Sequence, residues 1–266
     1  MTVARLVLLL CLAFLVCSCS SAAQTPVPVY LQAAGSTSWL PLITELAAAY
    51  HERYPYVFIE TAGGDSALGE QMVAAGQVDL GLVSRPQEAL PSTLRTTVVA
   101  RDAIAVIVHP TNPITSATLM QVRGLFSGRL NDWQQLGGAS LAVQVISRED
   151  GSGTRTTFER MAMQGMRVTP MALVMPSSRA VVERVGSDAQ AVGYVSMGYL
   201  DARVKALEVE GLPPAPANAS SGAYVLTREL ALLTPASVSP EANAFLDFVL
   251  GPAGQAIVAQ HYGRVR

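Results

Sequence analysis

Alternation of apolar, strand-like runs with small-residue loops and helical runs is the feature that most constrains the fold of this chain. Strands are expected at 27–33, 56–61 and 79–83, and each ends in a loop of small or polar residues. Helices are expected between them, at 39–50 and 67–75. Such alternation is typical of a parallel α/β sheet, which binds ligands beyond the carboxyl ends of its strands.

Small polar side chains and one arginine follow these strands: Ser36, Thr37, Ser38, Ser66, Ser84 and Arg85. Each hydroxyl residue, taken alone, is best explained as a helix N-cap. Their recurrence at successive strand ends, together with Ser152 further along the chain, instead favours one shared anion site.

A second polar loop, Arg148-Glu149-Asp150-Gly151-Ser152-Gly153-Thr154, precedes a helix-compatible run. A helix N-terminus directs unpaired N–H groups outward, and glycines let the backbone come close to a ligand. Ser152 and Thr154 add hydroxyl donors, and the planar fork of Arg148 fits a tetrahedral oxyanion. The loop therefore predicts a pocket for a small oxyanion, with an ordinary N-capped loop as the alternative.

The composition excludes several classes of function. The net charge is −2, with no basic block, which disfavours nucleic-acid binding. All the cysteines lie within the first 19 residues, so the mature chain would contain no disulfide and no thiol nucleophile. The histidines, at positions 51, 109 and 261, lack the spacing of metal ligands. We expect neither a metal nor a cofactor.

The first residues are expected to form a targeting segment. Arg5 precedes an apolar run over 6–16 that is too short to span a bilayer. The sequence Val16-Cys17-Ser18-Cys19 resembles a bacterial lipobox, and Cys19 fits best because the small Ser18 precedes it. We expect a lipoprotein signal peptide over 1–18, a lipid anchor on Cys19 and a tether over 19–28. Secretion with cleavage near Ala22-Ala23 is the alternative.

The rest of the chain continues the α/β pattern. We expect strands over 103–108, 142–147, 193–196 and 224–227. Helices are expected over 119–126 and 181–185, with a helical pair over 240–262. We expect a break suited to a lobe crossing at 109–113, a loop over 213–217, and core packing of the Met-rich segment 161–175.

The order of these segments closely resembles the PstS-like phosphate-binding proteins of bacterial phosphate uptake transporters. The segments that carry the resemblance are 35–38, 79–86, 101–113, 126–133, 191–195 and the loop 148–154, which matches the family's Arg-x-Asp-Gly-Ser-Gly-Thr. The resemblance implies the α/β fold of type II periplasmic-binding proteins, in which two lobes, each a mainly parallel sheet flanked by helices, enclose the ligand. Lobe I would comprise 29–108 and 222–266, and lobe II 109–221.

The same resemblance implies a monomeric, extracytoplasmic receptor that captures inorganic phosphate and delivers it to the membrane permease of an ABC transporter. Carried over by position, the phosphate donors would be Thr37, Ser38 and Ser66 from lobe I, Ser84 or Arg85 at the cleft edge, and Arg148, Ser152, Gly153 (through its N–H) and Thr154 from lobe II. Donors on both sides of the cleft imply that binding closes the lobes.

Two departures from the family pattern bear on selectivity. Well-known members place an Asp after the cleft-edge Ser, where it accepts the proton of HPO4²⁻, and this chain has Arg85 there. Asp65 stands where a small residue is common. Because sulfate lacks that proton, a carboxylate acceptor would favour phosphate. Asp150 and Asp65 are the candidate acceptors, although Asp150 could instead orient Arg148 or cap its loop.

Other functions remain as alternatives. The chain could be a receptor for tungstate, molybdate or sulfate, or a phosphate-sensing or adhesion lipoprotein at the cell surface. A hydrolase with Ser66 or Ser152 as nucleophile is disfavoured, because residues 64–69 lack Gly-x-Ser-x-Gly spacing and no histidine lies in a comparable loop. We therefore expect that the chain is not an enzyme.

Overall fold

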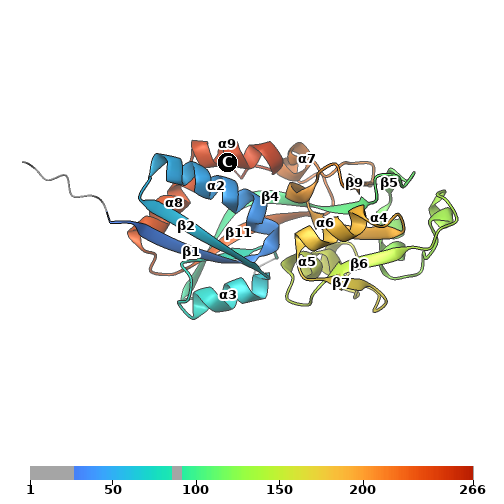
Figure 1. The fold of residues 1–266 in the computed structure, drawn as a ribbon, viewed down its shortest axis with the longest axis horizontal. Coiled ribbons are helices and arrows are strands. Elements are labelled where there is room, and N and C mark those ends of the chain that lie inside the picture. The colour runs from blue at the N-terminus through green and yellow to red at the C-terminus, as the bar shows by residue number, and fades with distance from the viewer. Residues whose placement is uncertain (1–26, 86–91, 266) are drawn as a thin grey trace, which may run out of the picture.

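The structure is a computed structural model that describes residues 27–85 and 92–265. Two lobes lie side by side along the long axis of the molecule, and the long strand β4 (Leu94–Val108) passes from one to the other (Figure 1). The predicted signal peptide and the predicted lipid anchor at Cys19 lie outside the described residues.

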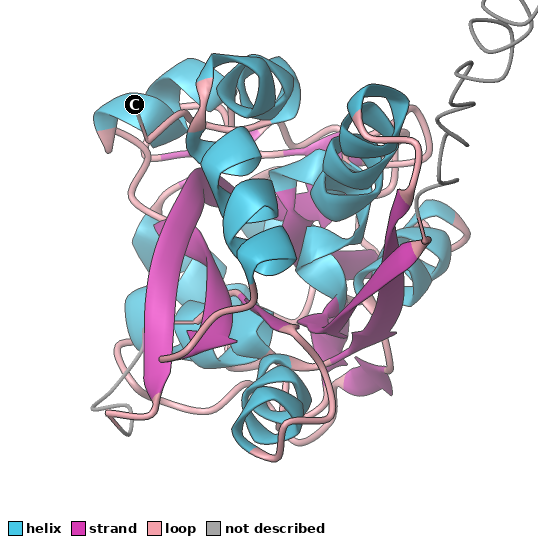
Figure 2. Ribbon diagram, turned by 90° about the vertical axis from the view of Figure 1, so that its left-hand side faces the viewer, coloured by secondary structure: helices cyan, strands magenta, loops and turns pink. Residues whose placement is uncertain are grey.

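Lobe I is built on three parallel strands. Strand β1 pairs in parallel with β2 and with β3, which confirms the parallel pairing expected from the N-terminal alternation. Strand β11 then inserts antiparallel between β3 and β4. The elements are β1 (Val29–Ser36), η1 (Thr37–Trp39), α2 (Leu40–Arg53), β2 (Val57–Gly64), α3 (Ser66–Ala74), β3 (Leu80–Val83), β11 (Thr227–Pro235), α8 (Pro240–Leu250) and α9 (Pro252–His261). Figure 2 shows helices on both sides of the strands.

Lobe II repeats this plan with shorter elements. Strand β6 pairs in parallel with β7 and β8, and the last part of β4 pairs antiparallel with β8. The elements are β5 (Ser116–Ala117), α4 (Leu119–Phe126), η2 (Trp133–Leu136), β6 (Gln144–Arg148), α5 (Gly153–Met161), β7 (Leu173–Met175), α6 (Ser178–Gly186), β8 (Ala191–Ser196), η3 (Met197–Tyr199), β9 (Lys205–Ala206), β10 (Glu208–Val209) and α7 (Pro216–Ser221).

Strand β4 changes partner in the middle of the molecule. Its residues up to Ala103 pair with β11, and Ile104–Val108 pair with β8. Because nearly every residue from 99 to 108 is buried, the strand passes through the interior without a turn. The chain therefore passes from lobe I into lobe II before the predicted break at 109–113. The lobe boundary predicted at residue 108 lies after the point at which β4 changes its pairing partner.

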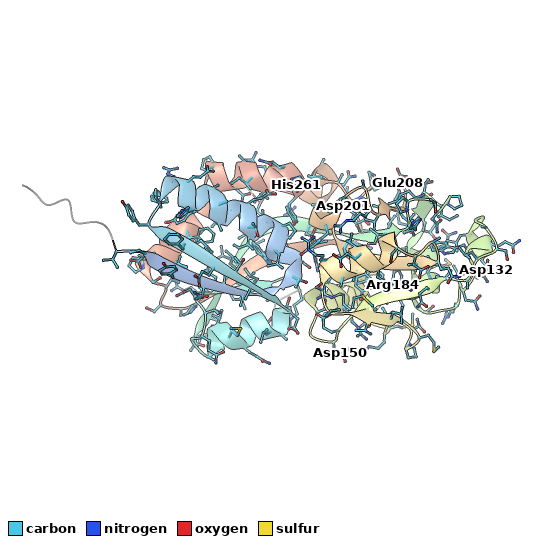
Figure 3. All side chains as sticks on the ribbon, in the orientation of Figure 1. Asp132, Asp150, Arg184, Asp201, Glu208 and His261 are labelled. Atoms are coloured by element: carbon cyan, nitrogen blue, oxygen red, sulfur yellow. The ribbon has the colours of Figure 1, made fainter. Side chains whose placement is uncertain are left out.

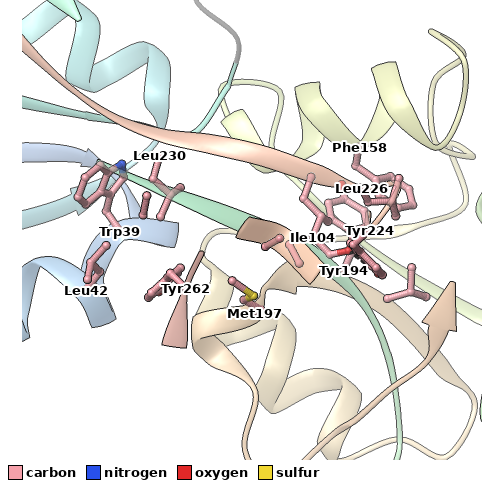
Figure 4. Close-up of a cluster of buried hydrophobic side chains, with 14 of the residues drawn as sticks. Trp39, Leu42, Ile104, Phe158, Tyr194, Met197, Tyr224, Leu226, Leu230 and Tyr262 are labelled. Carbon is pink, nitrogen blue, oxygen red and sulfur yellow. Dashed lines mark hydrogen bonds between the residues drawn. The ribbon is translucent and has the colours of Figure 1, made fainter. Parts of the chain in front are cut away.

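One apolar core joins the lobes where β4 crosses. Trp39 and Tyr262 line it from lobe I, and Phe158 and Tyr194 line it from lobe II (Figure 4). The indole Nε1 of Trp39 donates to the carbonyl of Val83 at 2.8 Å, and the rings of Phe158 and Tyr194 stack with centroids 4.1 Å apart. These contacts anchor η1 and α5, and with them the loops from which both helices begin.

Several local predictions need correction. The strand expected over 224–227 begins only at Thr227, because Tyr224 lies in a turn from which its hydroxyl donates to the carbonyl of Ile104 at 3.1 Å. Helix α7 begins inside the loop expected over 213–217. The Met-rich segment is only partly core, since Met163 is buried whereas the side chain of Met171 is exposed.

Among the described helices, none alone is long and apolar enough to span a membrane. Helices α8 and α9 reach the required length only as a pair, bent by 57°. In this structure their residues Phe245, Val249 and Val258 are buried in the core of lobe I.

The buried phenol of Tyr194 offers a test of this core. Its hydroxyl lies 2.8 Å from Ser147 Oγ, and burial raises the pKa of Tyr194 to about 12, so the phenol remains a hydrogen-bond donor at neutral pH. We expect Tyr194→Phe to lower the free energy of unfolding by about 1 kcal/mol, because Ser147 loses its buried partner. Urea unfolding checks this, and an unchanged midpoint would contradict it.

Candidate functional site

Most of the predicted site residues meet in one buried cluster between the lobes. The carboxyl ends of β1, β2 and β3 contribute from lobe I, and the loop after β6 contributes from lobe II. The hydroxyl and arginine side chains are at most 5% exposed. This interlobe cluster contains Ser36, Thr37, Ser38, Ser66, Ser84, Arg148, Ser152, Gly153 and Thr154.

A chain of serine hydroxyls forms the lobe I side of the interlobe cluster. Ser36 Oγ lies 2.7 Å from Ser84 Oγ, and Ser84 Oγ lies 3.4 Å from Ser66 Oγ. The backbone N–H of Ser84 also donates to Ser66 Oγ at 3.1 Å. Because β1 and β3 run in parallel register, their ends place Ser36 and Ser84 side by side.

Direct contacts join the two lobes across this cluster. Ser38 Oγ lies 2.7 Å from Thr154 Oγ1, and Thr37 Oγ1 lies 3.3 Å from Ser178 Oγ. The hydroxyl of Tyr199 donates to the carbonyl of Thr37 at 2.7 Å. A Cβ atom on Gly153 would lie 2.2 Å from Ser66 Oγ, so only glycine permits this approach. The lobes are therefore closed on each other.

Helix N-termini converge on the same place. Helix α3 begins at Ser66 and α5 begins at Gly153. Within the described chain, the backbone N–H groups of Ser66, Gly153 and Thr154 donate to no protein acceptor. Ser152 caps α5, since its Oγ accepts from the N–H of Arg155 at 3.3 Å, and its own hydroxyl proton remains a donor. Unpaired N–H groups at helix starts favour anions.

Two buried arginines flank the interlobe cluster. Arg148 donates through Nε and Nη2 to both carboxylate oxygens of Glu149, and through Nη1 to Ser178 Oγ at 3.2 Å. Arg228 donates to Thr154 Oγ1 at 2.8 Å, and its Nε donates to Asp102 Oδ2 at 2.9 Å. Because each guanidinium is paired with a carboxylate, the interlobe cluster is rich in donors without a large excess of charge.

Sequence reasoning missed Arg228 and Asp102, because both lie within strands rather than in strand-end loops. The available signal for Arg228 was a lone arginine at the start of the apolar run that forms β11. Asp102 is fully buried and accepts from Ser196 Oγ at 2.9 Å and from the N–H of Met197 at 3.1 Å. Burial raises the pKa of Asp102, against the opposing influence of Arg228.

Three predicted site residues lie outside the interlobe cluster. Arg85 is half-buried at its rim and donates to both carboxylate oxygens of Glu70. Asp65 caps α3, where its Oδ1 accepts from the N–H of Leu68 at 2.8 Å. Asp150 lies on the outer side of its loop (Figure 3) with its side chain 75% exposed.

Asp150 does not orient Arg148. Its carboxylate forms ion pairs with Arg155 and Arg167, and Glu149 holds Arg148 instead. The alternative that assigned the orienting role to Asp150 was therefore wrong. Asp65 is closer to the cleft, because its carboxylate faces Gly151 on the opposite lobe.

Two cavities adjoin the interlobe cluster from different sides. One, of about 750 Å³, lies next to Thr37 and Tyr199 and is also lined by Arg179 and Arg203. The other, of about 440 Å³, lies behind Arg228 and is lined by residues that include Arg101, Arg160, Tyr224 and Arg228. Within the described residues, no three His, Asp or Glu side chains gather in a way that could hold a metal ion.

Comparison with known proteins places these features in a family. A model of the PBP superfamily domain matches residues 20–253. The phosphate-binding protein PstS of Bacillus subtilis is 27% identical to the chain over 224 residues, which are 82% of this chain and 74% of that protein.

Solved structures give the same result. One is a protein from Clostridium perfringens, described as a phosphate ABC transporter substrate-binding protein and solved with bound phosphate. It is 31% identical to this chain, and the two structures superpose with a TM-score of 0.85 over 89% of this chain and all of that one. An ABC-type phosphate transport receptor from Vibrio cholerae is 29% identical with a TM-score of 0.71, covering 88% of this chain and 99% of that one. The predicted two-lobed α/β fold is thereby confirmed.

Proposed function

Because this chain belongs to the PBP superfamily and, within it, to the PstS-like phosphate-binding proteins, we propose that it captures inorganic phosphate between its lobes and delivers it to an ABC transporter. Its relatives are transport receptors rather than enzymes. The observation that carries the proposal is the buried convergence of hydroxyls, helix N-termini and arginines from both lobes.

The interlobe cluster suits phosphate because its donors are directional and shielded from water. Hydrogen bonds to a charged group contribute about 1.5–3 kcal/mol each, and a closed, low-dielectric site strengthens them. Ser and Thr hydroxyls can also accept a hydrogen bond, so Ser36, Ser66 or Ser84 can meet a protonated phosphate oxygen. Pairing of Arg148 with Glu149 and of Arg228 with Asp102 makes recognition depend on geometry more than on net charge.

The receptor acts outside the cytoplasm, where it passes phosphate to a membrane permease. Closure about β4 brings donors of both lobes onto one anion, and the permease binds the closed form. A lipid on Cys19 would hold the protein at the membrane, and the chain would work as a monomer.

Selectivity for phosphate over sulfate depends on what accepts the phosphate proton. Of the two proposed carboxylates, Asp65 is the better placed, because it faces Gly151 across the cleft, whereas Asp150 is engaged with two arginines near solvent. We expect Asp150→Asn to leave the ratio of phosphate to sulfate affinity unchanged. Parallel titrations of Asp65→Asn and Asp150→Asn with both anions check this, and a loss of preference in Asp150→Asn alone would contradict it.

The hydroxyl of Tyr199 provides a second, milder test of closure. It donates to the carbonyl of Thr37 across the cleft, a contact made only when the lobes meet. We expect Tyr199→Phe to weaken phosphate binding by about fivefold, which corresponds to one neutral hydrogen bond of about 1 kcal/mol. Calorimetric titration measures it, and an unchanged dissociation constant would show that this bond does not contribute to closure.

Calorimetric titration of the mature protein tests the proposed function. The protein is first freed of bound anion by unfolding and refolding, and is then titrated with phosphate, sulfate, molybdate and tungstate at neutral pH. The proposal predicts micromolar or tighter binding of phosphate and no detectable binding of sulfate. Tight tungstate or molybdate binding with weak phosphate binding would instead identify a receptor for another oxyanion.

A further inference from the structure

We propose that Arg228 is a positioning residue of the phosphate site, which orients the Ser38–Thr154 hydroxyl pair toward the anion and links the closed lobes. The inference rests on the proposed function and extends it to a residue at the start of β11. Its guanidinium is buried and makes hydrogen bonds to both lobes.

The contacts of Arg228 place it between the lobes. Nη1 donates to Thr154 Oγ1 of lobe II at 2.8 Å and to the carbonyl of Ser84 of lobe I at 3.1 Å. Nη2 donates to Ser38 Oγ at 3.0 Å. One rigid, planar group therefore fixes the first loop of lobe I, the end of β3 and the start of α5 in a single arrangement.

The hydrogen bonds from Arg228 determine whether the Ser38–Thr154 hydroxyl pair can donate a proton to an anion. Ser38 Oγ and Thr154 Oγ1 each accept an N–H of Arg228 and lie 2.7 Å from each other. The two hydroxyls carry two protons, and one of them is used in their mutual hydrogen bond. The other proton is left to donate outward. Arg228 thus makes this pair a donor to an anion rather than an acceptor.

Asp102 holds Arg228 in place. Its carboxylate accepts from Nε at 2.9 Å, and it also accepts from Ser196 Oγ and the N–H of Met197 at the end of β8. Asp102 immediately precedes Ala103 and Ile104, between which β4 changes its partner from β11 to β8. The pair therefore ties the phosphate ligands to the strand about which the lobes move.

The test uses variants that avoid leaving a buried charge unpaired. Arg228→Lys keeps a cation opposite Asp102 but cannot reach both hydroxyls with a planar fork. The double variant Arg228→Gln with Asp102→Asn replaces both charges by neutral hydrogen-bonding groups. Arg101→Gln is the matched control, because Arg101 is adjacent to Asp102 on β4 but its guanidinium is exposed and donates to the carbonyl of Ser220.

Each variant is titrated calorimetrically with inorganic phosphate after circular dichroism has shown that it is folded. We expect both Arg228 variants to raise the dissociation constant at least about tenfold and Arg101→Gln to change it less than twofold. A second readout separates positioning from general support of the fold. In a Thr154→Ala background, Arg228→Lys should cause a much smaller further loss, because Arg228 acts through Thr154.

The outcomes distinguish this inference from the proposed function. If the wild-type protein binds no phosphate, the proposed function fails and the role of Arg228 fails with it. If the wild type binds phosphate and both Arg228 variants bind within about twofold of it, only the inference about Arg228 is wrong. If Arg228→Lys weakens phosphate binding by the same factor in the Thr154→Ala background as in the wild type, Arg228 supports the fold in general. That result would also overturn the inference about Arg228.

Discussion

Replacing Gly153 by alanine is expected to weaken phosphate binding by at least about 100-fold while the protein remains folded. The new methyl would lie 2.2 Å from Ser66 Oγ, 2.8 Å from Ser84 Oγ and 3.0 Å from Ser66 Cβ, all on the opposite lobe. The lobes could then no longer close to the spacing at which both donate to one anion. Loss of two charge-assisted hydrogen bonds, at about 1.5–3 kcal/mol each, gives this magnitude.

Calorimetric titration measures the affinity of Gly153→Ala, and small-angle scattering with and without phosphate measures closure. Thr156→Ala is the control, because Thr156 is exposed on the same helix. Gly151→Ala should have a smaller effect, since the three atoms nearest its methyl would belong to the carboxylate of Asp65, which can move, rather than to backbone. Wild-type affinity in Gly153→Ala would refute the closed arrangement of the binding site.

Arg148→Gln should also reduce phosphate affinity by about 100-fold or more. The substitution removes a buried guanidinium that donates to Ser178 in the interlobe cluster. It also leaves the carboxylate of Glu149, whose side chain is 30% exposed, without its cation close to the incoming anion. Both the lost donor and the uncompensated negative charge act against binding.

A second substitution separates these two contributions. Arg148→Gln combined with Glu149→Gln should recover part of the loss, because the uncompensated carboxylate is gone. Arg184→Gln serves as the control, since Arg184 lies on α6 in lobe II and its partner is Asp188, just beyond the end of that helix. Equal affinities for Arg148→Gln and the wild type, measured by calorimetry, would exclude Arg148 from the phosphate site.

The parts of the site that depend on local structure could be predicted from the sequence. Parallel strands end at one edge of a sheet, so Ser36, Ser66 and Ser84 were expected together, and they form a continuous chain of hydroxyls. The loop at 148–154 could be placed because its glycines and N-cap residue signal a helix start directly.

The remainder depended on tertiary pairing that a single sequence does not reveal. Arg228 and Asp102 meet because β11 inserts beside β4, and the register of that pairing cannot be read from the sequence. Arg85 and Asp150 were expected at the anion site from their position in motifs. Competing partners, Glu70 for Arg85 and Arg155 with Arg167 for Asp150, hold them outside the buried cluster.

A crystal structure of the protein with bound phosphate tests the central claim most directly. The account predicts one phosphate between the lobes, within hydrogen-bond distance of the hydroxyls of Ser38 and Thr154, the N–H of Gly153 and the guanidinium of Arg148. Phosphate found instead in the cavity lined by Arg101, Arg160 and Tyr224, with the hydroxyls of Ser38 and Thr154 making no contact with it, would contradict it.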